Sequence, residues 1–389
     1  KTQQKLEVFE DGRLVYSQDV VSTRVGGNLP TNPEPPTPPV PTTPEPPTDA
    51  DSSRILEQAI RKTLRKAEGE ALTPDDFSKV KTLTVSAGTR GPKVKDLAYL
   101  KRCPNLERLF LQNHAVKDLG PLAGLKKLVY FNLDRNQVTD LAPLAKLPVL
   151  KEVWLQGNLV TNLGPLAGLK TIEELRLDAN QIADLAPLGG LTALRELSLN
   201  ENQVADLKPL AALVKLKTLK FSPTEGTELE PVLGQMKALE QMLLSGTVMK
   251  NLGPLADPLK DHPALVSISA SQCQVEDISA LADLPQLERL QLMGNRITDL
   301  KALDGMARLN SLILSNNRVT DLSPLTGAPS LSTLWLTGNQ VQDVTPLKEL
   351  KKLRTVLLQA NRVTPAQLEE LRQAIPGCRV NNKTANPKP

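Results

Sequence analysis

The sequence predicts an α/β solenoid: a curved stack of repeated turns with a parallel β-sheet on the concave side, short 3₁₀ arcs on the convex side and a helical N-terminal cap. Residues 133–147 are LDRNQVTDLAPLAKL, and residues 177–191 are nearly the same, LDANQIADLAPLGGL. Leucine fills most apolar positions of this repeat, while aromatic residues make up only 3% of the chain. A core of many small, similar layers is typical of a solenoid, in which each repeat packs only against its neighbours.

The repeat has one period over most of its length. From residue 81 to about residue 363 the chain follows L-x-x-L-x-L-x-x-N-x-V-x-D-L-x-P-L-x-x-L, which predicts about thirteen turns. Asparagine occupies one slot of the pattern at Asn136, Asn158, Asn180, Asn202, Asn295, Asn317, Asn339 and Asn361. The same slot holds Gly88, His114, Thr224, Thr247 and Cys273.

The types of residue in the repeat have physical reasons. The L-x-L pair has strand period, so two leucines point inward and the residue between them points outward. The slot asparagine has donors and acceptors that can satisfy backbone groups out of reach of water. The aspartate four residues later is placed to cap the 3₁₀ arc, and proline follows where no amide is needed. One turn cannot bury its leucines alone, whereas stacked turns can.

Shorter segments precede the repeats. Residues 1–28 contain two alternating runs, which predict a short β-hairpin, either a remnant or the end of a preceding domain. Residues 29–50 are rich in proline, which favours polyproline II and predicts a semi-rigid linker, with a PxxP ligand as the less favoured alternative. Residues 51–80 combine an amphipathic helical pattern with Thr73 as an N-cap before Pro74, so they predict a helical N-terminal cap.

The middle and the ends of the chain differ from the regular repeats. Two turns between residues 221 and 265 are longer and lack the slot asparagine, and we hypothesise a kink, a bulging loop or weaker local stability there. Residues 364–380 predict a C-terminal cap and residues 381–389 a disordered tail. The chain begins at Lys1 without an initiator Met or a leader, so we expect that it has been trimmed or processed.

The repeat resembles leucine-rich-repeat proteins, specifically the 22-residue class found in bacterial internalin-like surface proteins and in eukaryotic phosphatase regulators of similar period. The resemblance covers roughly residues 53–380 and is specific, because many copies agree in both residue type and spacing. The helices before the repeats are similar to the helical cap of the internalin type, and TPAQLEELRQAIPGCRV is similar to the terminal cap of such solenoids.

Residues suited to catalysis or metal binding are scarce. Of the two histidines, His114 occupies the asparagine slot, where a structural hydrogen-bonding role is favoured, and His262 lies in a lengthened turn. The repeated aspartates lack the dense spacing of a calcium loop. Cys103, Cys273 and Cys378 lie many turns apart, so we expect three reduced, buried thiols. We therefore expect no enzymatic activity, no cofactor and no metal.

Function is expected on the concave face. Aromatic residues of successive turns should form an exposed cluster bordered by carboxylates, and a second apolar group should lie near the other end; both features are typical of protein interfaces. The residues assigned to partner binding are Phe110, Tyr130, Trp154, Glu152, Glu174, Arg176, Asp178, Glu196, Met293, Ile313, Trp335 and Leu357.

These observations favour a monomeric, non-enzymatic scaffold that binds a protein or peptide. The resemblance to internalin-like proteins implies a secreted or surface-anchored location outside the bacterial cytoplasm; the alternative is a cytoplasmic regulatory subunit similar to the phosphatase-associated repeats. With 47 basic and 43 acidic residues and no dense Lys/Arg run, nucleic acid is an unfavourable partner. No apolar run is long enough to span a membrane.

Overall fold

The computed structural model describes residues 3–10, 13–21, 49–87, 91–223, 230–245, 249–260 and 262–381. The chain divides into two units, residues 1–45 and 46–389. In the first unit β1 (Gln3–Glu10) pairs antiparallel with β2 (Arg13–Val21). The proline-rich segment up to residue 48, the tail from residue 382 and the slots at residues 88, 224 and 247 lie outside the described residues.

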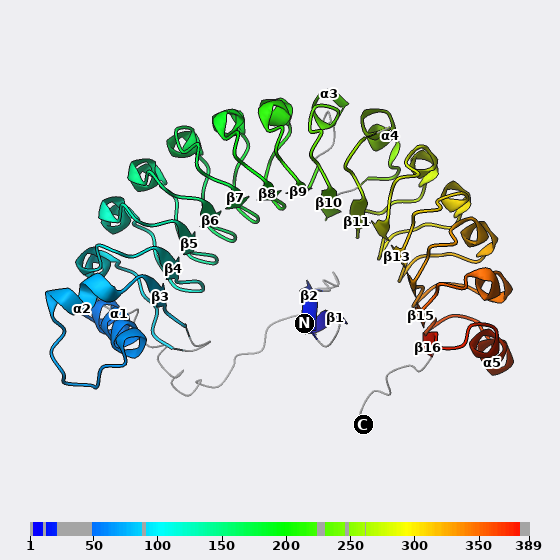
Figure 1. Ribbon diagram of the computed structural model, residues 1–389, viewed down its shortest axis with the longest axis horizontal. Coiled ribbons are helices and arrows are strands. Elements are labelled where there is room, and N and C mark those ends of the chain that lie inside the picture. The colour runs from blue at the N-terminus through cyan, green and yellow to red at the C-terminus, as the bar shows by residue number, and fades with distance from the viewer. Residues whose placement is uncertain are drawn as a thin grey trace, which may run out of the picture. The chain divides into compact units, whose positions relative to one another are not determined.

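The second unit is a curved solenoid whose described strands form one parallel sheet on the inner side of the arch (Figure 1). The sheet has 14 strands that follow one another in chain order, β3 to β16. Their bounds are β3 Thr82–Thr84, β4 Arg108–Phe110, β5 Tyr130–Asn132, β6 Glu152–Trp154, β7 Glu174–Arg176, β8 Glu196–Leu199, β9 Thr218–Phe221, β10 Gln241–Ser245, β11 Ser267–Ser271, β12 Arg289–Gln291, β13 Ser311–Ile313, β14 Thr333–Trp335, β15 Thr355–Leu357 and β16 Arg379–Asn381.

Short helical segments form the outer side of the arch. Most are 3₁₀ arcs: η1 Ala98–Arg102, η2 Gly120–Gly124, η3 Ala142–Lys146, η4 Gly164–Leu166, η5 Ala186–Gly190, η6 Lys208–Ala212, η7 Ser279–Asp283, η8 Lys301–Leu303, η9 Ser323–Gly327 and η10 Thr345–Glu349. The helices α3 (Glu230–Leu233) and α4 (Gly253–Leu259) stand in for the arc in the two lengthened turns. The predicted solenoid, with its concave parallel sheet and convex 3₁₀ arcs, is confirmed.

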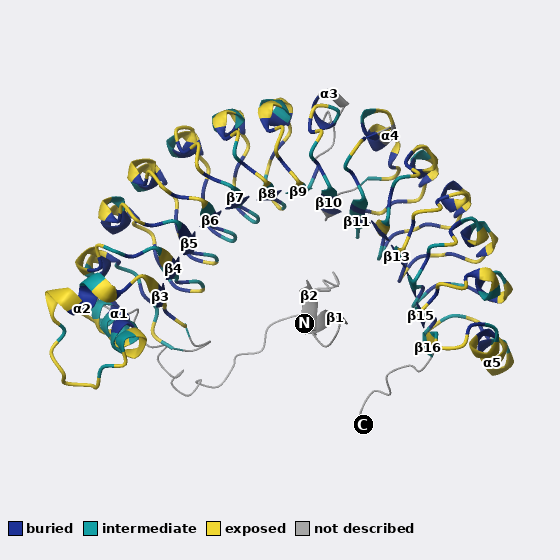
Figure 2. Ribbon diagram, viewed as in Figure 1, coloured by how far each residue is buried: buried dark blue, intermediate teal, exposed yellow. Residues whose placement is uncertain are grey.

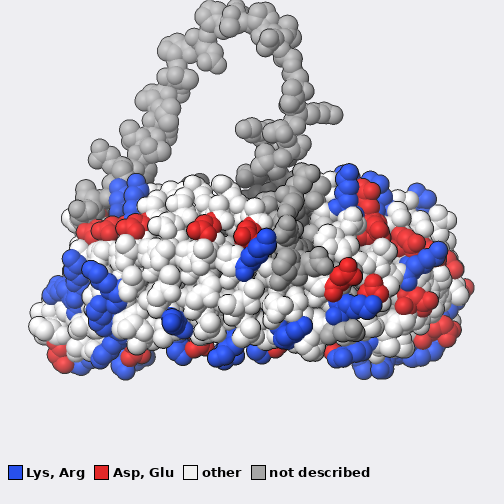
Figure 3. Space-filling model, turned by 90° about the horizontal axis from the view of Figure 1, so that it is seen from above, with Lys and Arg blue, Asp and Glu red and all other residues white. Residues whose placement is uncertain are grey.

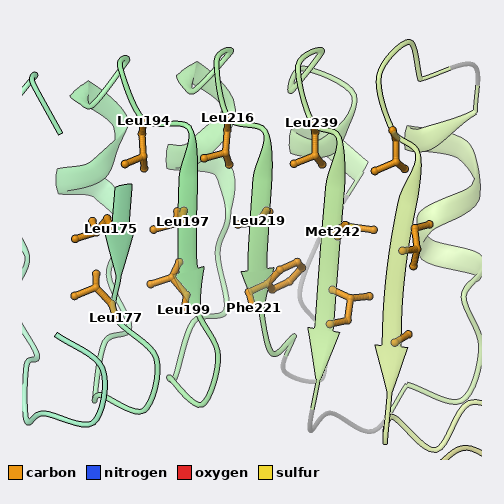
Figure 4. Close-up of a cluster of buried hydrophobic side chains, with 14 of the residues drawn as sticks. Leu175, Leu177, Leu194, Leu197, Leu199, Leu216, Leu219, Phe221, Leu239 and Met242 are labelled. Carbon is orange, nitrogen blue, oxygen red and sulfur yellow. The ribbon is translucent and has the colours of Figure 1, made fainter. Parts of the chain in front are cut away.

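The core is a continuous series of buried leucines between sheet and arcs. In β7, β8 and β9 the buried residues Leu175, Leu197 and Leu219 point inward and pair in register. Figure 4 shows that the side chains of successive turns lie in rows, and these residues belong to one hydrophobic cluster. Figure 2 shows buried residues running along the interior of every turn, with exposed residues mainly on the outer side. Each turn therefore completes the core of its neighbour.

Asparagine side chains connect the turns by hydrogen bonds. Asn158 Oδ1 accepts the Val138 amide at 2.9 Å, and its Nδ2 donates to the carbonyls of Leu133 at 3.0 Å and Leu155 at 2.9 Å. Two of these partners belong to the preceding turn, so one side chain satisfies buried backbone groups of both turns. The same pattern is made by Asn136, Asn180, Asn202, Asn295, Asn317, Asn339 and Asn361.

Among the described turns, two take another residue at the asparagine position. His114 Nδ1 accepts the Val94 amide at 3.0 Å, and its Nε2 lies 3.2 Å from the Val85 carbonyl oxygen. Burial lowers the pKa of His114, which favours the neutral ring that this pair of contacts requires. Cys273 is fully buried, and its amide donates to Asn295 Oδ1 at 3.0 Å.

The repeated aspartates begin the arcs. Asp140 Oδ1 accepts the Ala142 amide, the first of η3, at 2.8 Å, which satisfies a donor that the arc itself leaves open. The aspartates that make the same contact are Asp118, Asp184, Asp206, Asp277, Asp299, Asp321 and Asp343.

Helices cover both ends of the solenoid. At the N-terminal end α1 (Asp49–Leu64) and α2 (Pro74–Lys79) pack against the first turns, and Thr73 and Asp76 form a reciprocal capping box at the start of α2. At the C-terminal end α5 (Pro365–Ala374) begins with a similar box, and β16 adds the last strand to the sheet. The N-terminal helical cap is confirmed.

The sheet continues through the irregular middle. β10 pairs in parallel with both β9 and β11, and β10 and β11 are five residues long where most strands have three. The loops at residues 224–229 and 246–248 lie outside the described residues.

The cysteines form no disulfide in the described part of the chain. Cys103 and Cys273 are buried. The prediction that Cys378 is also buried is wrong, because it is half-buried between α5 and the end of the sheet. Burial raises the pKa of the Cys103 thiol to about 11, so this thiol stays protonated and unreactive at neutral pH.

Candidate concave binding surface

The concave surface is made by the outward residues of each strand. In β4 the central Leu109 is buried, while Arg108 and Phe110 on either side of it face outward. The same alternation recurs along the sheet, and the parallel register places equivalent residues of neighbouring strands side by side. Side chains that are far apart in the sequence therefore form continuous columns on the inner side of the arch.

Three aromatic rings lie next to one another on β4, β5 and β6. The ring centroids of Phe110 and Tyr130 are 4.7 Å apart, and those of Tyr130 and Trp154 are 5.4 Å apart with the planes nearly perpendicular. These separations are typical of favourable aromatic pairs. We call Phe110, Tyr130 and Trp154 the aromatic row.

The prediction that all three rings are exposed is wrong for Tyr130. Its side chain is only 2% exposed, because Phe110 and Trp154 flank it and the Arg108 guanidinium lies 4.7 Å from its ring centroid. This burial raises the pKa of the Tyr130 hydroxyl to about 12. Phe110 and Trp154 stay half-exposed, so Tyr130 supports the two rings that a partner can touch.

Arginine lies over each end of the aromatic row. Arg108 is 5.9 Å from the Phe110 centroid, and Arg176 is 3.9 Å from the Trp154 centroid, within cation–π range. Arg176 Nε also lies 2.6 Å from Glu174 Oε1, and its Nη2 lies 3.8 Å from Glu196. Arg176 therefore joins the aromatic row to the acidic residues beside it.

A column of glutamates borders the row. Glu152, Glu174 and Glu196 pair in register on β6, β7 and β8, so three carboxylates of like charge stand on adjacent strands. Burial raises the pKa of Glu174, with Glu196 and Glu152 adding to the effect, while Arg176 opposes it. A further positive charge near this column would stabilise the ionised form.

Asp134 and Asp178 lie two residues after the ends of β5 and β7, respectively. Asp178 accepts hydrogen bonds from Gln156 Nε2 at 2.6 Å, from the Asn200 amide at 3.0 Å and from Ser198 Oγ. Asp134 Oδ1 accepts the Gln156 amide at 2.8 Å, and burial raises the pKa of Asp134. These hydrogen bonds hold the carboxylate of Asp178 in place on the concave surface, where it adds a negative charge.

A second group of apolar side chains lies toward the C-terminal end. Ile313, Trp335 and Leu357 pair in register on β13, β14 and β15, and each is half-exposed, as is Met293 beside them. We call these four residues the apolar patch. Their neighbours in the outward column are Ser311, Thr333 and Thr355, which carry no charge. β6 and β14 are eight strands apart, so Trp154 and Trp335 are separated by roughly 40 Å along the sheet.

Known proteins share this architecture. A family model described as leucine-rich repeats (two copies) matches residues 93–146 and 307–349. A crystal structure of an internalin, inlF, from Listeria monocytogenes is similar over 86% of this chain and 97% of that one, with 26% identity and a TM-score of 0.68. The chain contains leucine-rich repeats, and its fold is similar to that of an internalin. A leucine-rich-repeat protein from Leptospira interrogans has the same fold, with 18% identity, a TM-score of 0.57 and coverage of 79% of this chain and 97% of that one. A search among curated proteins finds no match.

Other surfaces of this leucine-rich-repeat protein are less distinctive. Figure 3 looks down on the arch and shows Lys and Arg mixed with Asp and Glu toward its long edges, with a largely uncharged band between them on the left. The described residues contain no group of three or more His, Cys, Asp or Glu able to hold a metal ion. In the described part of the chain no helix has the length and apolarity to cross a membrane.

The partner-binding residues predicted from the sequence leave out several residues of this concave surface. Strand alternation predicts that Arg108, Asp134 and Gln112 line the concave face, but they are not among the residues assigned to partner binding. Arg108 carried a usable signal, because it stands two residues before Phe110 in an outward position. The stacking of Arg108 on Tyr130 could not be predicted from the sequence, because it depends on the rotamer of Arg108.

Proposed function

We propose that this protein is a non-enzymatic scaffold whose concave face binds a protein or peptide partner. The observation that carries the proposal is the aromatic row beside the glutamate column: half-exposed Phe110 and Trp154, supported by buried Tyr130, next to Glu152, Glu174 and Glu196. Large aromatic side chains bordered by charge are the usual anchors of protein interfaces.

The charge of the surface favours a partner segment that is both basic and apolar. Five carboxylates, including Asp134 and Asp178, surround the row, against the two guanidinium groups of Arg108 and Arg176. A complementary positive segment would be steered to this area and would keep the carboxylates paired when water is excluded.

The apolar patch supports a second point of contact. Met293, Ile313, Trp335 and Leu357 present apolar surface framed by hydroxyl groups, which suits an uncharged part of the partner. Because the two areas lie roughly 40 Å apart along the sheet, one partner must be extended or large to contact both. Losing either contact should then weaken binding by less than losing both.

We also propose that the protein works outside the bacterial cytoplasm. The likeness to an internalin along most of both chains supports this location. Protease treatment of intact source cells tests it: digestion of the protein before cell lysis agrees with the proposal, and protection until lysis contradicts it.

Partner capture with matched variants tests binding. The full chain is used to isolate partners from the native source, and affinity is then measured for Trp154→Ala, Trp335→Ala and the control Val214→Ala, whose side chain is 55% exposed away from the concave columns. We expect loss of about tenfold or more for Trp154→Ala, a smaller loss for Trp335→Ala and no change for the control. Equal affinity for the Trp154 and Val214 variants would rule out the proposed site.

A further inference from the structure

Three buried polar atoms on the described concave face lack a hydrogen-bond partner. Among the described residues three buried side-chain atoms have no hydrogen-bond partner: Gln112 Oε1, Trp154 Nε1 and Glu174 Oε1. Trp154 belongs to the aromatic row and Glu174 to the glutamate column beside it, whereas Gln112 follows β4. Buried polar groups without partners are uncommon in folded proteins and call for a specific explanation.

Arg176 lies against the two residues Trp154 and Glu174. Its guanidinium stacks 3.9 Å from the Trp154 centroid, and its Nε lies 2.6 Å from Glu174 Oε1 without the alignment of a hydrogen bond. Arg176 therefore stacks on the Trp154 ring and pairs with the Glu174 carboxylate, while Trp154 Nε1 has no acceptor. Its Nη2 already lies 3.8 Å from Glu196, which offers another carboxylate if Arg176 turns away.

From this geometry, and resting on the proposed function, we infer that Trp154 and Glu174 form a binding site for a guanidinium group of the partner, and that Arg176 occupies this site until the partner's arginine replaces it. An incoming arginine finds the same ring face for stacking and the same carboxylate for pairing. A guanidinium has five donors in a planar fork, so a freely placed one can align with Glu174 better than Arg176 does from its fixed position two residues along the same strand.

The charges around the site are consistent with an exchange. Release of Arg176 toward Glu196 leaves its own charge paired, while Glu152, Glu174 and Asp134 remain to balance the incoming cation. A neutral side chain of the same shape would gain the stacking but would leave the displaced ion pair uncompensated. The site should therefore discriminate arginine from a neutral analogue.

The test uses Trp154 as its own reporter. The chain has two tryptophans, so Trp335→Phe leaves Trp154 as the single one. Its fluorescence is titrated with acetyl-Gly-Arg-Gly-amide and with the citrulline peptide, which has nearly the same shape but no charge. We expect saturable change with the arginine peptide and binding at least about tenfold weaker with citrulline.

Variants in the same background separate exchange from general electrostatics. Arg176→Ala should bind the arginine peptide about fivefold more tightly, Glu174→Gln should bind it more weakly, and Lys220→Ala should change affinity by less than about twofold. Lys220 lies in the same outward column two strands away, so its removal changes the net charge equally. Unchanged or weaker binding by Arg176→Ala, or an equal gain in Lys220→Ala, would overturn the inference.

The result is independent of the capture experiment. A partner that depends on Trp154 while the arginine peptide fails to bind would leave the proposed function standing and remove this inference. If the peptide binds but no captured partner depends on Trp154, the guanidinium site stands and the proposed partner-binding function fails.

Discussion

At the residue scale, stability depends on side chains that serve two turns at once. Asn158 hydrogen-bonds with its own turn and with the preceding one through Val138 and Leu133. Asn162, four residues later, is exposed and bonds only with the Gly164 amide in its own turn, at 2.8 Å. The two asparagines have the same chemistry but different burial, which makes them a matched pair.

Asn158→Ala should therefore destabilise the protein much more than Asn162→Ala. The first change leaves a buried amide and two carbonyls unsatisfied and should lower the free energy of unfolding by about 2–4 kcal/mol. The second removes an exposed cap and should cost about 1 kcal/mol. Urea unfolding followed by far-UV circular dichroism measures both, and equal losses would show that the buried network adds nothing.

His114 makes stability depend on pH. Burial lowers its pKa in the folded state, so the unfolded chain binds a proton first when the pH falls below about 6.5. The contribution of the neutral ring is thus complete above pH 6.5 and is lost as the pH falls through that value toward the lower pKa of the folded state. His262 has the same sign for the same reason.

His114→Asn restores the asparagine of the repeat and removes one of these two titrations. We expect the variant to lose less stability than the wild type between pH 7 and pH 5, as measured by urea unfolding at each pH. Identical pH slopes for the two proteins would contradict the burial of a neutral His114.

In the described turns the residue before the asparagine position adopts a left-handed backbone. Gly157, Gly294 and Gly338 have φ between 65° and 71°, and Ala179 has φ of 53° at the equivalent position. Left-handed backbone disfavours alanine relative to glycine. Ala179→Gly should raise the unfolding free energy by up to about 1 kcal/mol. The same change at Ala142, in η3, should lower it by about 0.5–1 kcal/mol, and calorimetry that finds both variants destabilised would refute the strain at Ala179.

At the element scale, the turns are alike except around α3 and α4. Most regular turns repeat the same arc, the capping aspartate and the asparagine that connects turns, whereas the lengthened turns use longer strands and place Cys273 in the asparagine position. A cysteine side chain is a weaker hydrogen-bonding group than an amide. These turns should therefore open locally more often than their neighbours.

Hydrogen exchange tests this difference. We expect the amides of β10 and β11 to exchange at least about tenfold faster than those of β6 and β7, because a local loss of about 1.4 kcal/mol corresponds to that factor. Exchange at equal rates in the two regions would show that the irregular turns are as stable as the regular ones.

At the scale of the whole molecule, the repeat fixes the architecture and the spacing of the concave columns. Asn158 and Asn180 stand one period apart in the sequence and make the same hydrogen bonds in neighbouring turns, so period alone predicted their place. The outward position of Trp154 followed from strand alternation in the same way. Properties that obey the repeat were predictable from the sequence.

Properties that depend on contact between unlike side chains were not predictable. Tyr130 occupies an outward position but is covered by Phe110, Trp154 and Arg108, each from a rotamer choice that the pattern does not encode. The stacking of Arg176 on Trp154, and the ion pair that competes with it, likewise appeared only when the turns were assembled. The chemistry of the candidate site therefore came from the structure.

The central proposal is that the partner binds to the concave, inner side of the arch. Radical footprinting of the captured complex, read by mass spectrometry, measures the oxidation of individual side chains with and without partner. We expect the partner to protect Phe110, Trp154 and Trp335 from oxidation. Labelling of Leu159 and Val214, which are exposed at other positions of the turns, should not change. Protection of Leu159 or Val214 while Trp154 remains fully labelled would place the interface elsewhere and contradict the claim.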